Sequence, residues 1–124
     1  MNLRTSRAAT RITNLRLDAV IGCNDWERHR TQEIIINIFM EFDAAEAIAS
    51  DLLEKTLDYR AIKKKILASV AASSFNLLES LTAHILRLVM EEPRVLHAEV
   101  TVDKPKALRF ADSVSITLAA DCDR

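Results

Sequence analysis

The sequence predicts one α+β domain with the element order ββααββ, in which an antiparallel sheet carries both helices on one face. Three observations predict this fold. Apolar and polar residues alternate in four stretches, two on each side of the middle of the chain, as in half-buried strands. Between these stretches, apolar residues recur every three or four positions, as in amphipathic helices. The 124 residues contain neither repeats nor low-complexity segments, which suits a single domain.

The composition narrows the environment and the partners. A net charge of −1 gives no broad electrostatic attraction to nucleic acid or to anionic membranes. No apolar run approaches the roughly 20 residues that a membrane-spanning helix needs. Cys23 and Cys122 lie far apart and form no CxxC motif, and the basic N-terminus lacks the apolar core of a signal peptide. We therefore expect a cytoplasmic protein without nucleic-acid or membrane partners.

The ends of the chain carry no periodic pattern. Residues 1–11 are expected to form a flexible N-terminal arm, residues 12–120 the domain, and residues 121–124 a short C-terminal tail.

Two strands are predicted in the first third of the domain. Alternation from Ile12 predicts a strand that ends at Gly22, where glycine suits a turn or a bulge. A second strand is predicted from Glu33 to Asp43, because β-branched residues dominate its apolar face. These strands are expected to pair as an antiparallel hairpin.

Helical spacing follows. Alanine-rich residues 44–53 are expected to form one or two helical turns. A helix is predicted from Tyr59, with Asp58 as its N-cap. After a break at residues 73–76, a second helix is predicted to run until Pro93 stops it.

The last third returns to alternation. One strand is predicted from Val95 to Lys104, and another around residues 114–118. One face of the resulting sheet would lack a helical cover and still carry Ile35 and Phe39. Because the sheet edges and this face would need partners, we expect an oligomer, with sites between subunits.

Four polar residues stand at the ends of predicted elements: Glu27, Tyr59, Glu79 and Lys104. Each also has an ordinary structural explanation. Glu27 and Lys104 suit solvated positions at a turn and a strand end, and Tyr59 suits a half-buried ring with its hydroxyl in water. Glu79 completes a capping-box pattern with Asn76, so its carboxylate can serve the helix N-terminus.

The sequence contains no motif typical of a metal site or of a nucleotide-binding site. The three histidines, His29, His84 and His97, form no HxH or HExxH pair, so we expect no metal site. His84 is expected on a helix surface and His97 on the outer face of the sheet. A chain with one glycine cannot build a glycine-rich phosphate loop, so we expect no nucleotide cofactor.

Four motifs occur in order along the chain: residues 22–27 (Gly-Cys-Asn-Asp-Trp-Glu), 56–59 (Thr-Leu-Asp-Tyr), 75–79 (Phe-Asn-Leu-Leu-Glu) and 102–105 (Val-Asp-Lys-Pro). Together they resemble the dihydroneopterin aldolase and dihydroneopterin triphosphate 2′-epimerase family, and the resemblance extends over nearly the whole domain. It implies the tunnelling fold, whose ββααββ subunits form rings with pterin sites between neighbours. A homo-oligomer, either a tetramer or an octamer of two stacked rings, is therefore expected.

The resemblance also assigns residues to the pterin. Glu79 corresponds to the anchor whose carboxylate accepts two hydrogen bonds from the ring, a short and directional charge-assisted pair. The macrodipole of a helix can hold such an acid in the first turn while it faces a site. Main-chain groups around Leu57 and Asp58 correspond to further pterin contacts.

The same resemblance gives Lys104 and Tyr59 the acid–base roles and places Glu27 beside the trihydroxypropyl side chain. In this chemistry, cleavage of C1′–C2′ leaves electrons that the pterin's own C6=N5 imine can take up. Neither a metal, a lysine imine nor a cofactor is then required, only an acid and a base within hydrogen-bond reach. Epimerisation at C2′ uses the same intermediate.

The motifs divide between the two activities. The continuation Lys104-Pro105-Lys106-Ala107 departs from the Lys-Pro-Gly-Ala that aldolases usually carry and is more like the epimerases. The run Asp25-Trp26-Glu27 favours an aldolase of folate biosynthesis, which is the function expected first, with the epimerase as the alternative. Four basic residues suit either a triphosphate or plain solvation: Arg28, Arg30, Lys106 and Arg109.

A third hypothesis is an oligomeric binding module without catalysis. A scaffold has no reason to place Glu27, Tyr59, Glu79 and Lys104 around one pterin-sized pocket. Divergence of these four side chains in the structure would therefore count against an enzyme.

Overall fold

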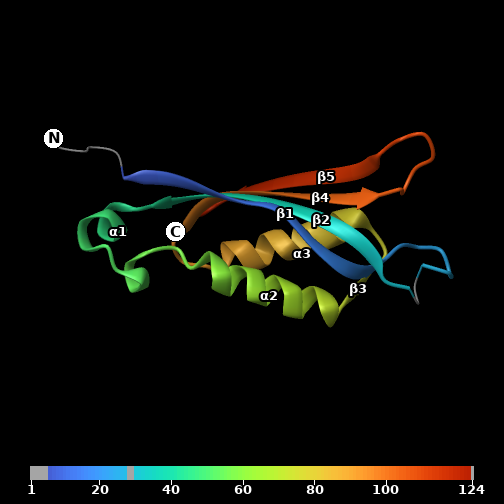
Figure 1. Cartoon of the computed structure of the whole chain (residues 1–124), viewed down its shortest axis with the longest axis horizontal. Coiled ribbons are helices and arrows are strands. Elements are labelled where there is room, and N and C mark those ends of the chain that lie inside the picture. Colours follow the sequence, from blue (N-terminus) through green and yellow to red (C-terminus); the bar gives the residue numbers. More distant parts are fainter. Residues whose placement is uncertain (1–5, 28–29, 124) are drawn as a thin grey trace.

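The computed structural model describes residues 6–27 and 30–123, and it shows a curled sheet with two long helices against one face (Figure 1). The strand order is β3-β1-β2-β4-β5, antiparallel except for β3, which runs parallel to β1. The elements in chain order are β1 (Arg7–Ile21), β2 (Gln32–Asp43), α1 (Ala45–Ser50), the 3-10 turn η1 (Leu53–Lys55), α2 (Tyr59–Ala71), β3 (Ser74–Phe75), α3 (Leu78–Met90), β4 (Val95–Pro105) and β5 (Ser113–Asp121). The predicted α+β order is confirmed, and β3 is an addition that the sequence did not predict.

β1 begins five residues earlier than predicted. Arg7 pairs with Asp43, and the ladder to β2 continues from there. The flexible arm predicted for residues 1–11 is therefore wrong for residues 7–11. Only the small side chain of Ala8 packs against the core here, but backbone pairing does not need a large apolar face. Residues 1–5 lie outside the described residues.

A β-bulge interrupts β1 between Ile12 and Leu15. Asn14 has a left-handed φ of 54°, and its N–H donates to Oδ1 of Asn37 at 2.9 Å. In a regular strand, residues three apart face opposite sides. The bulge's extra residue lets both Ile12 and Leu15 pack on the core.

The core lies between the sheet and the two long helices. The predicted stripe of α2 is buried at Ile62, Ile66 and Val70. α3 buries more of its surface: Leu81, Thr82, Ile85, Leu86 and Val89. β2 meets them with a row of fully buried side chains: Ile34, Ile36, Ile38 and Met40. Burial of each such side chain contributes roughly 1.5–3 kcal/mol to the free energy of folding. This packing holds both helices against the sheet.

The opposite face of the sheet carries no helix (Figure 1). Ile35 and Phe39 are half-buried there, and the guanidinium of Arg11 lies 4.8 Å above the Phe39 ring. Within the described residues, no strand pairs with the outer edge of β5. The outer edge of β1 pairs only with the two residues of β3. Among the helices described, none is long and apolar enough to cross a membrane.

Candidate functional site

The turn after β1 is built around Gly22. Its backbone has a φ of 141°, which side chains other than hydrogen rarely allow, and its N–H donates to the carbonyl of Phe75 at 2.9 Å. A Cβ atom at this position would overlap the carboxyl group of Glu27. Glycine is therefore needed here for two reasons, and the second is the approach of a candidate catalytic acid.

Glu27 is buried, with 7% of its surface exposed. Nζ of Lys104 donates to Oε2 at 2.8 Å, across 77 positions of sequence. The Lys104 hydrogen bond is the main reason that the pKa of Glu27 lies below its ordinary value of 4.5, although burial opposes it. The Lys104 side chain is only 15% exposed. The solvated positions considered for both residues are thus wrong: they form a largely buried ion pair between the turn after β1 and the end of β4.

Two further side chains hold this carboxylate. Nδ2 of Asn24 donates to Oε1 of Glu27 at 2.9 Å, and Nε2 of Gln32 donates to Oε2 at 3.3 Å. Gln32 also donates to the carbonyl of Ile21 at 2.9 Å, which joins the start of β2 to the end of β1. Neither residue was predicted as part of the site from the sequence. Their positions could have indicated them, because Asn24 lies in the same turn as Glu27 and Gln32 begins the next strand.

Glu79 is exposed in the first turn of α3, where the N-cap is Leu77 and no side chain caps the helix. The capping box with Asn76 is therefore absent, and Glu79 has no part in one. The segment before α3 is tied to the Glu27 turn, because Sγ of Cys23 donates to the carbonyl of Asn76 at 3.3 Å. Glu79 therefore lies in the first turn of a helix whose preceding segment contacts the turn that carries Glu27. We call this end of the molecule, with Glu27, Glu79 and Lys104, the acid–lysine half-site.

The motif at residues 56–59 lies elsewhere. Leu57 is buried, and Oδ1 of Asp58 accepts from the N–H of Ala61 at 3.1 Å, which confirms the predicted N-cap. Tyr59 is 51% exposed. The motif lines a cavity of about 370 Å³ together with the first turns of α2. We call this cavity the tyrosine half-site.

The two half-sites lie at opposite ends of α2. This helix starts at Tyr59 and has 13 residues, so it is about 20 Å long. It ends near β3, which pairs with the last residues of β1 beside the acid–lysine half-site (Figure 1). One chain therefore brings Glu27 and Lys104 into contact but leaves Tyr59 apart from them. The requirement that all four candidate residues surround one pocket is not met within a single subunit.

The histidines lie outside both half-sites. Nε2 of His84 is 2.6 Å from Oγ of Ser69, between α3 and α2, so its predicted place on a helix surface is wrong. His97 lies on the uncovered side of the sheet, edge-on to the ring of Phe39. Across residues 6–27 and 30–123, no group of three or more histidine, cysteine, aspartate and glutamate side chains could hold a metal ion. His29 lies outside the described residues.

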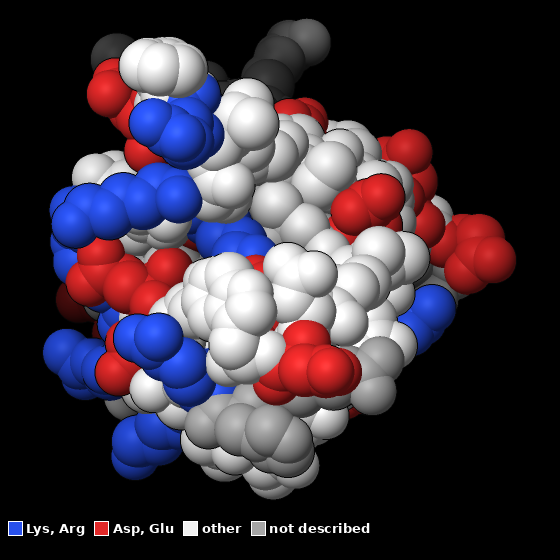
Figure 2. Space-filling model, turned by 90° about the vertical axis from the view of Figure 1, so that its right-hand side faces the viewer, with Lys and Arg blue, Asp and Glu red and all other residues white. Residues whose placement is uncertain are grey.

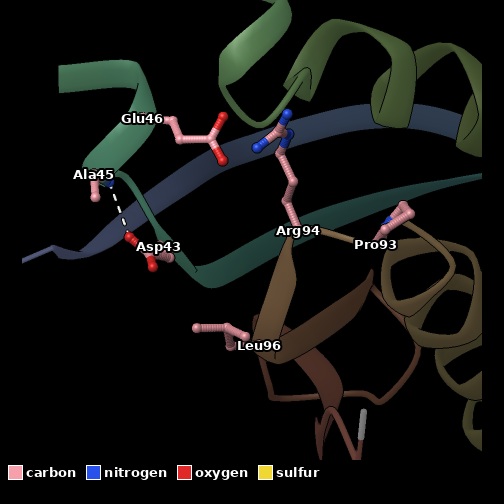
Figure 3. Close-up of a pocket in the computed structure, with 6 residues that line it drawn as sticks. All are labelled: Asp43, Ala45, Glu46, Pro93, Arg94 and Leu96. Atoms are coloured by element: carbon pink, nitrogen blue, oxygen red, sulfur yellow. Dashed lines mark hydrogen bonds between the residues drawn. The ribbon is translucent and has the colours of Figure 1, made fainter. Parts of the chain in front are cut away.

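A separate cavity of about 210 Å³ lies where β2 ends and β4 begins. Figure 3 shows Glu46 of α1 and Arg94 pointing toward one another across it. Nη2 of Arg94 donates to the carbonyl of Glu54 at 3.1 Å, which fastens η1 to the start of β4. None of the four candidate residues lines this cavity, so it belongs to neither half-site.

Comparison with known proteins shows what this chain is similar to. Residues 10–119 match the family model described as FolB, dihydroneopterin aldolase. A dihydroneopterin triphosphate 2′-epimerase of Pseudomonas aeruginosa is 47% identical over 117 residues, which cover 94% of this chain and 95% of that protein. The epimerase of Escherichia coli is 42% identical over 112 residues, 90% of this chain and 93% of that protein.

Similarity to aldolases is lower. A dihydroneopterin aldolase of Haemophilus influenzae is 25% identical over 111 residues, covering 90% of this chain and 94% of that protein. The crystal structure of E. coli dihydroneopterin aldolase in complex with neopterin superimposes with a TM-score of 0.86 at 24% identity, over 91% of this chain and 98% of that one. This structural likeness agrees with the α+β fold.

Proposed function

This chain belongs to the dihydroneopterin aldolase family, and from that premise we propose that it is a dihydroneopterin triphosphate 2′-epimerase. The observation that carries the choice is the much higher identity with two epimerases than with an aldolase over a similar span. The continuation Lys104-Pro105-Lys106 supports it. The sequence alone put the aldolase first, and that order is now reversed.

The substrate's own structure explains how few groups the reaction needs. Removal of the 2′-hydroxyl proton lets the C1′–C2′ bond break, and the electron pair enters the pterin through its C6=N5 imine. The products held in the site are an enamine and a two-carbon aldehyde that carries the triphosphate. Rotation of the aldehyde and attack by C1′ on its other face gives the 2′-epimer. Escape of the aldehyde and protonation of C1′ gives aldolase cleavage instead.

Lys104 and Tyr59 are proposed to move these protons, with Lys104 held by the ionised carboxylate of Glu27. Fixing Lys104 in this way keeps its ammonium group next to the developing alkoxide. Glu27 is also proposed to contact the hydroxylated side chain of the substrate. Glu79, exposed at the start of α3, is proposed to accept two hydrogen bonds from the pterin ring.

The main-chain groups of Leu57 and Asp58 are proposed to complete the pterin site, and they must then come from a second subunit. The separation of the two half-sites along α2 supports this. Within the described residues, the unpaired outer edge of β5 and the edge of β1, which pairs with β3 at two residues, support it as well. A homo-oligomer, proposed as two stacked tetrameric rings, would join the tyrosine half-site of one subunit to the acid–lysine half-site of the next. Membership of an enzyme family leaves the non-catalytic binding module without support.

The deciding experiment is incubation of the purified protein with dihydroneopterin and with dihydroneopterin triphosphate, followed by chromatographic separation of the products. Interconversion of the two 2′-epimers of the triphosphate, faster than formation of 6-hydroxymethyl-dihydropterin from either compound, is the expected result. Cleavage of unphosphorylated dihydroneopterin as the faster reaction would make the protein an aldolase. This second candidate has one specific sequence feature in its favour, Asp25-Trp26-Glu27.

A further inference from the structure

The loop between β4 and β5 follows Lys104 directly and carries two basic side chains, Lys106 and Arg109. Both are exposed, and neither forms an ion pair with any of the residues that the structure describes. Five other basic side chains form ion pairs with carboxylates: Arg7, Arg16, Lys55, Lys65 and Lys104. Lys63 and Arg87 on the helices are also exposed without an ion pair among the described residues, so position in the loop after Lys104 is what distinguishes Lys106 and Arg109. We propose that Lys106 and Arg109 form a polyphosphate subsite that binds the triphosphate of the substrate, an inference that rests on the proposed function.

The loop has a defined shape. The N–H of Lys106 donates to the carbonyl of Asp112 at 3.2 Å, and the N–H of Ala111 donates to the carbonyl of Leu108 at 3.3 Å. Lys106 and Phe110 have left-handed φ values of 61° and 69°. These bonds close the loop on itself, so its basic side chains start from fixed backbone positions.

Arg109 has an additional support. Its guanidinium lies 5.5 Å from the centre of the Phe110 ring, a ring that is fully exposed. Stacking on an aromatic face restricts a guanidinium without neutralising it, so its five donors remain available for phosphate oxygens. Contact with Arg109 is the one ring interaction of Phe110 among the described residues.

Position along the chain favours the same ligand. Lys106 is two residues beyond Lys104, so the two Cα atoms are at most about 7 Å apart. The triphosphate is attached one carbon beyond C2′, the carbon at which Lys104 is proposed to act. Figure 2 shows this end of the molecule, where Lys and Arg side chains gather on one side with acidic groups among them. Because Lys106 and Arg109 follow Lys104 within five residues, a polyphosphate attached next to C2′ would extend toward the loop that carries them.

Such a subsite would also influence which reaction occurs. Epimerisation requires that the two-carbon aldehyde stays bound until C1′ attacks it again, whereas cleavage requires that it leaves. Because the aldehyde carries the triphosphate, Lys106 and Arg109 would hold it during rotation. The subsite therefore favours epimerisation over cleavage.

The test is the double variant K106Q/R109Q, compared with the wild type and with K63Q/R87Q. The control removes the same number of exposed, unpaired charges from α2 and α3. For the triphosphate, we expect kcat/KM of K106Q/R109Q to fall by about 10- to 100-fold, mainly through KM, as for the loss of one or two charge-assisted pairs. We also expect the ratio of cleavage to epimerisation to rise, while turnover of unphosphorylated dihydroneopterin and the thermal midpoint stay unchanged.

Inorganic tripolyphosphate gives a readout that is independent of turnover. It should bind the wild type and K63Q/R87Q with equal affinity in calorimetry and bind K106Q/R109Q at least tenfold more weakly. Equal binding by all three proteins, or an equal loss in the control, would overturn the subsite. If the wild type only cleaves unphosphorylated dihydroneopterin, the proposed epimerase function fails, and the tripolyphosphate measurement still decides whether the subsite exists.

Discussion

The carboxyl group of Glu27 occupies the space that a side chain on Gly22 would fill. These residues lie five positions apart in one turn, and the same carboxylate also accepts a hydrogen bond from the ammonium of Lys104 in β4. The single glycine of this chain thus determines where the buried acid can lie. The backbone conformation at Gly22 therefore affects the position of the Glu27 carboxylate that contacts Lys104.

Gly22→Ala tests this coupling. The substitution forces a positive φ on alanine and displaces the Glu27 carboxyl group, so we expect a loss of roughly 1–3 kcal/mol in the free energy of unfolding. Turnover should also fall, because Lys104 loses its partner. Urea denaturation and steady-state kinetics measure the two effects. Asp25→Ala, an exposed change in the same turn, is the control and should leave both nearly unaltered.

Lys104→Met tests the buried ion pair. It leaves the Glu27 carboxylate without its counter-charge, which should cost about 3 kcal/mol at neutral pH, whereas the double variant with Glu27→Gln should recover part of this loss. The control pair Arg16 and Glu33 is exposed and should contribute less than about 1 kcal/mol. Additive losses in the double-mutant cycle would mean that Glu27 and Lys104 do not stabilise one another.

The pH dependence of this pair has a definite sign. The pKa of Glu27 is lower in the folded protein than its ordinary 4.5, so its contribution is present above about pH 4.5 and is lost as pH falls through the folded value. The stability difference between the wild type and Glu27→Gln should therefore shrink on acidification. A difference that grew below pH 4 would contradict the ionised carboxylate.

Much of the fold follows from local patterns. The alternation of β2 and the helical stripes at Ile62, Ile66 and Val70 reflect burial on one side, which a sequence records directly. β3 and residues 7–11 of β1 were missed because they are held by backbone hydrogen bonds, which leave little trace in side-chain type. The acid–lysine half-site depends on a contact across 77 positions, which periodicity cannot reveal.

The candidate site was harder to predict than the fold. Motif resemblance selected Glu27, Tyr59, Glu79 and Lys104, but it did not show that Glu27 and Lys104 are buried together. Nor did it identify Gln32, whose amide bridges Glu27 and the end of β1. These facts depend on how the turn after β1 packs against β2 and the end of β4, which is a property of the tertiary packing.

Glu79→Gln separates binding from folding. Glu79 is exposed and caps nothing, so the change should cost only about 0.3–1 kcal/mol of helix stabilisation from the macrodipole. Pterin affinity should fall strongly, because one amide cannot accept both ring hydrogens. Calorimetric titration with neopterin and a thermal melt measure the two effects. Unchanged affinity in a folded variant would remove Glu79 from the pterin site.

His97 should stabilise the fold more at low pH than at high pH, which is opposite to the pH dependence expected for Glu27. Its pKa is raised above 6.5, first by the Glu99 hydrogen bond and then by Asp121, while Glu41 of β2 adds a further negative charge. The protonated ring therefore stabilises the fold fully below pH 6.5, and this contribution is lost as pH rises through the folded value. The unfolding free energies of the wild type and His97→Gln should differ more at about pH 5.5 than at about pH 8.5. An NMR titration of His97 checks the shift directly.

Mixed oligomers give the sharpest test of a site shared between subunits. Tyr59→Phe damages only the tyrosine half-site, and Lys104→Ala damages only the acid–lysine half-site. If each complete site uses one half from each of two neighbours, co-refolding these inactive variants creates some interfaces with both halves intact. Activity in the mixture should then exceed that of either variant alone. Co-refolding Lys104→Ala with Glu27→Gln is the control, because both changes damage the same half-site and no interface regains it. Absence of recovery in the first mixture, with mixed oligomers demonstrated by mass spectrometry, would show that Tyr59 and Lys104 do not act together at one interface.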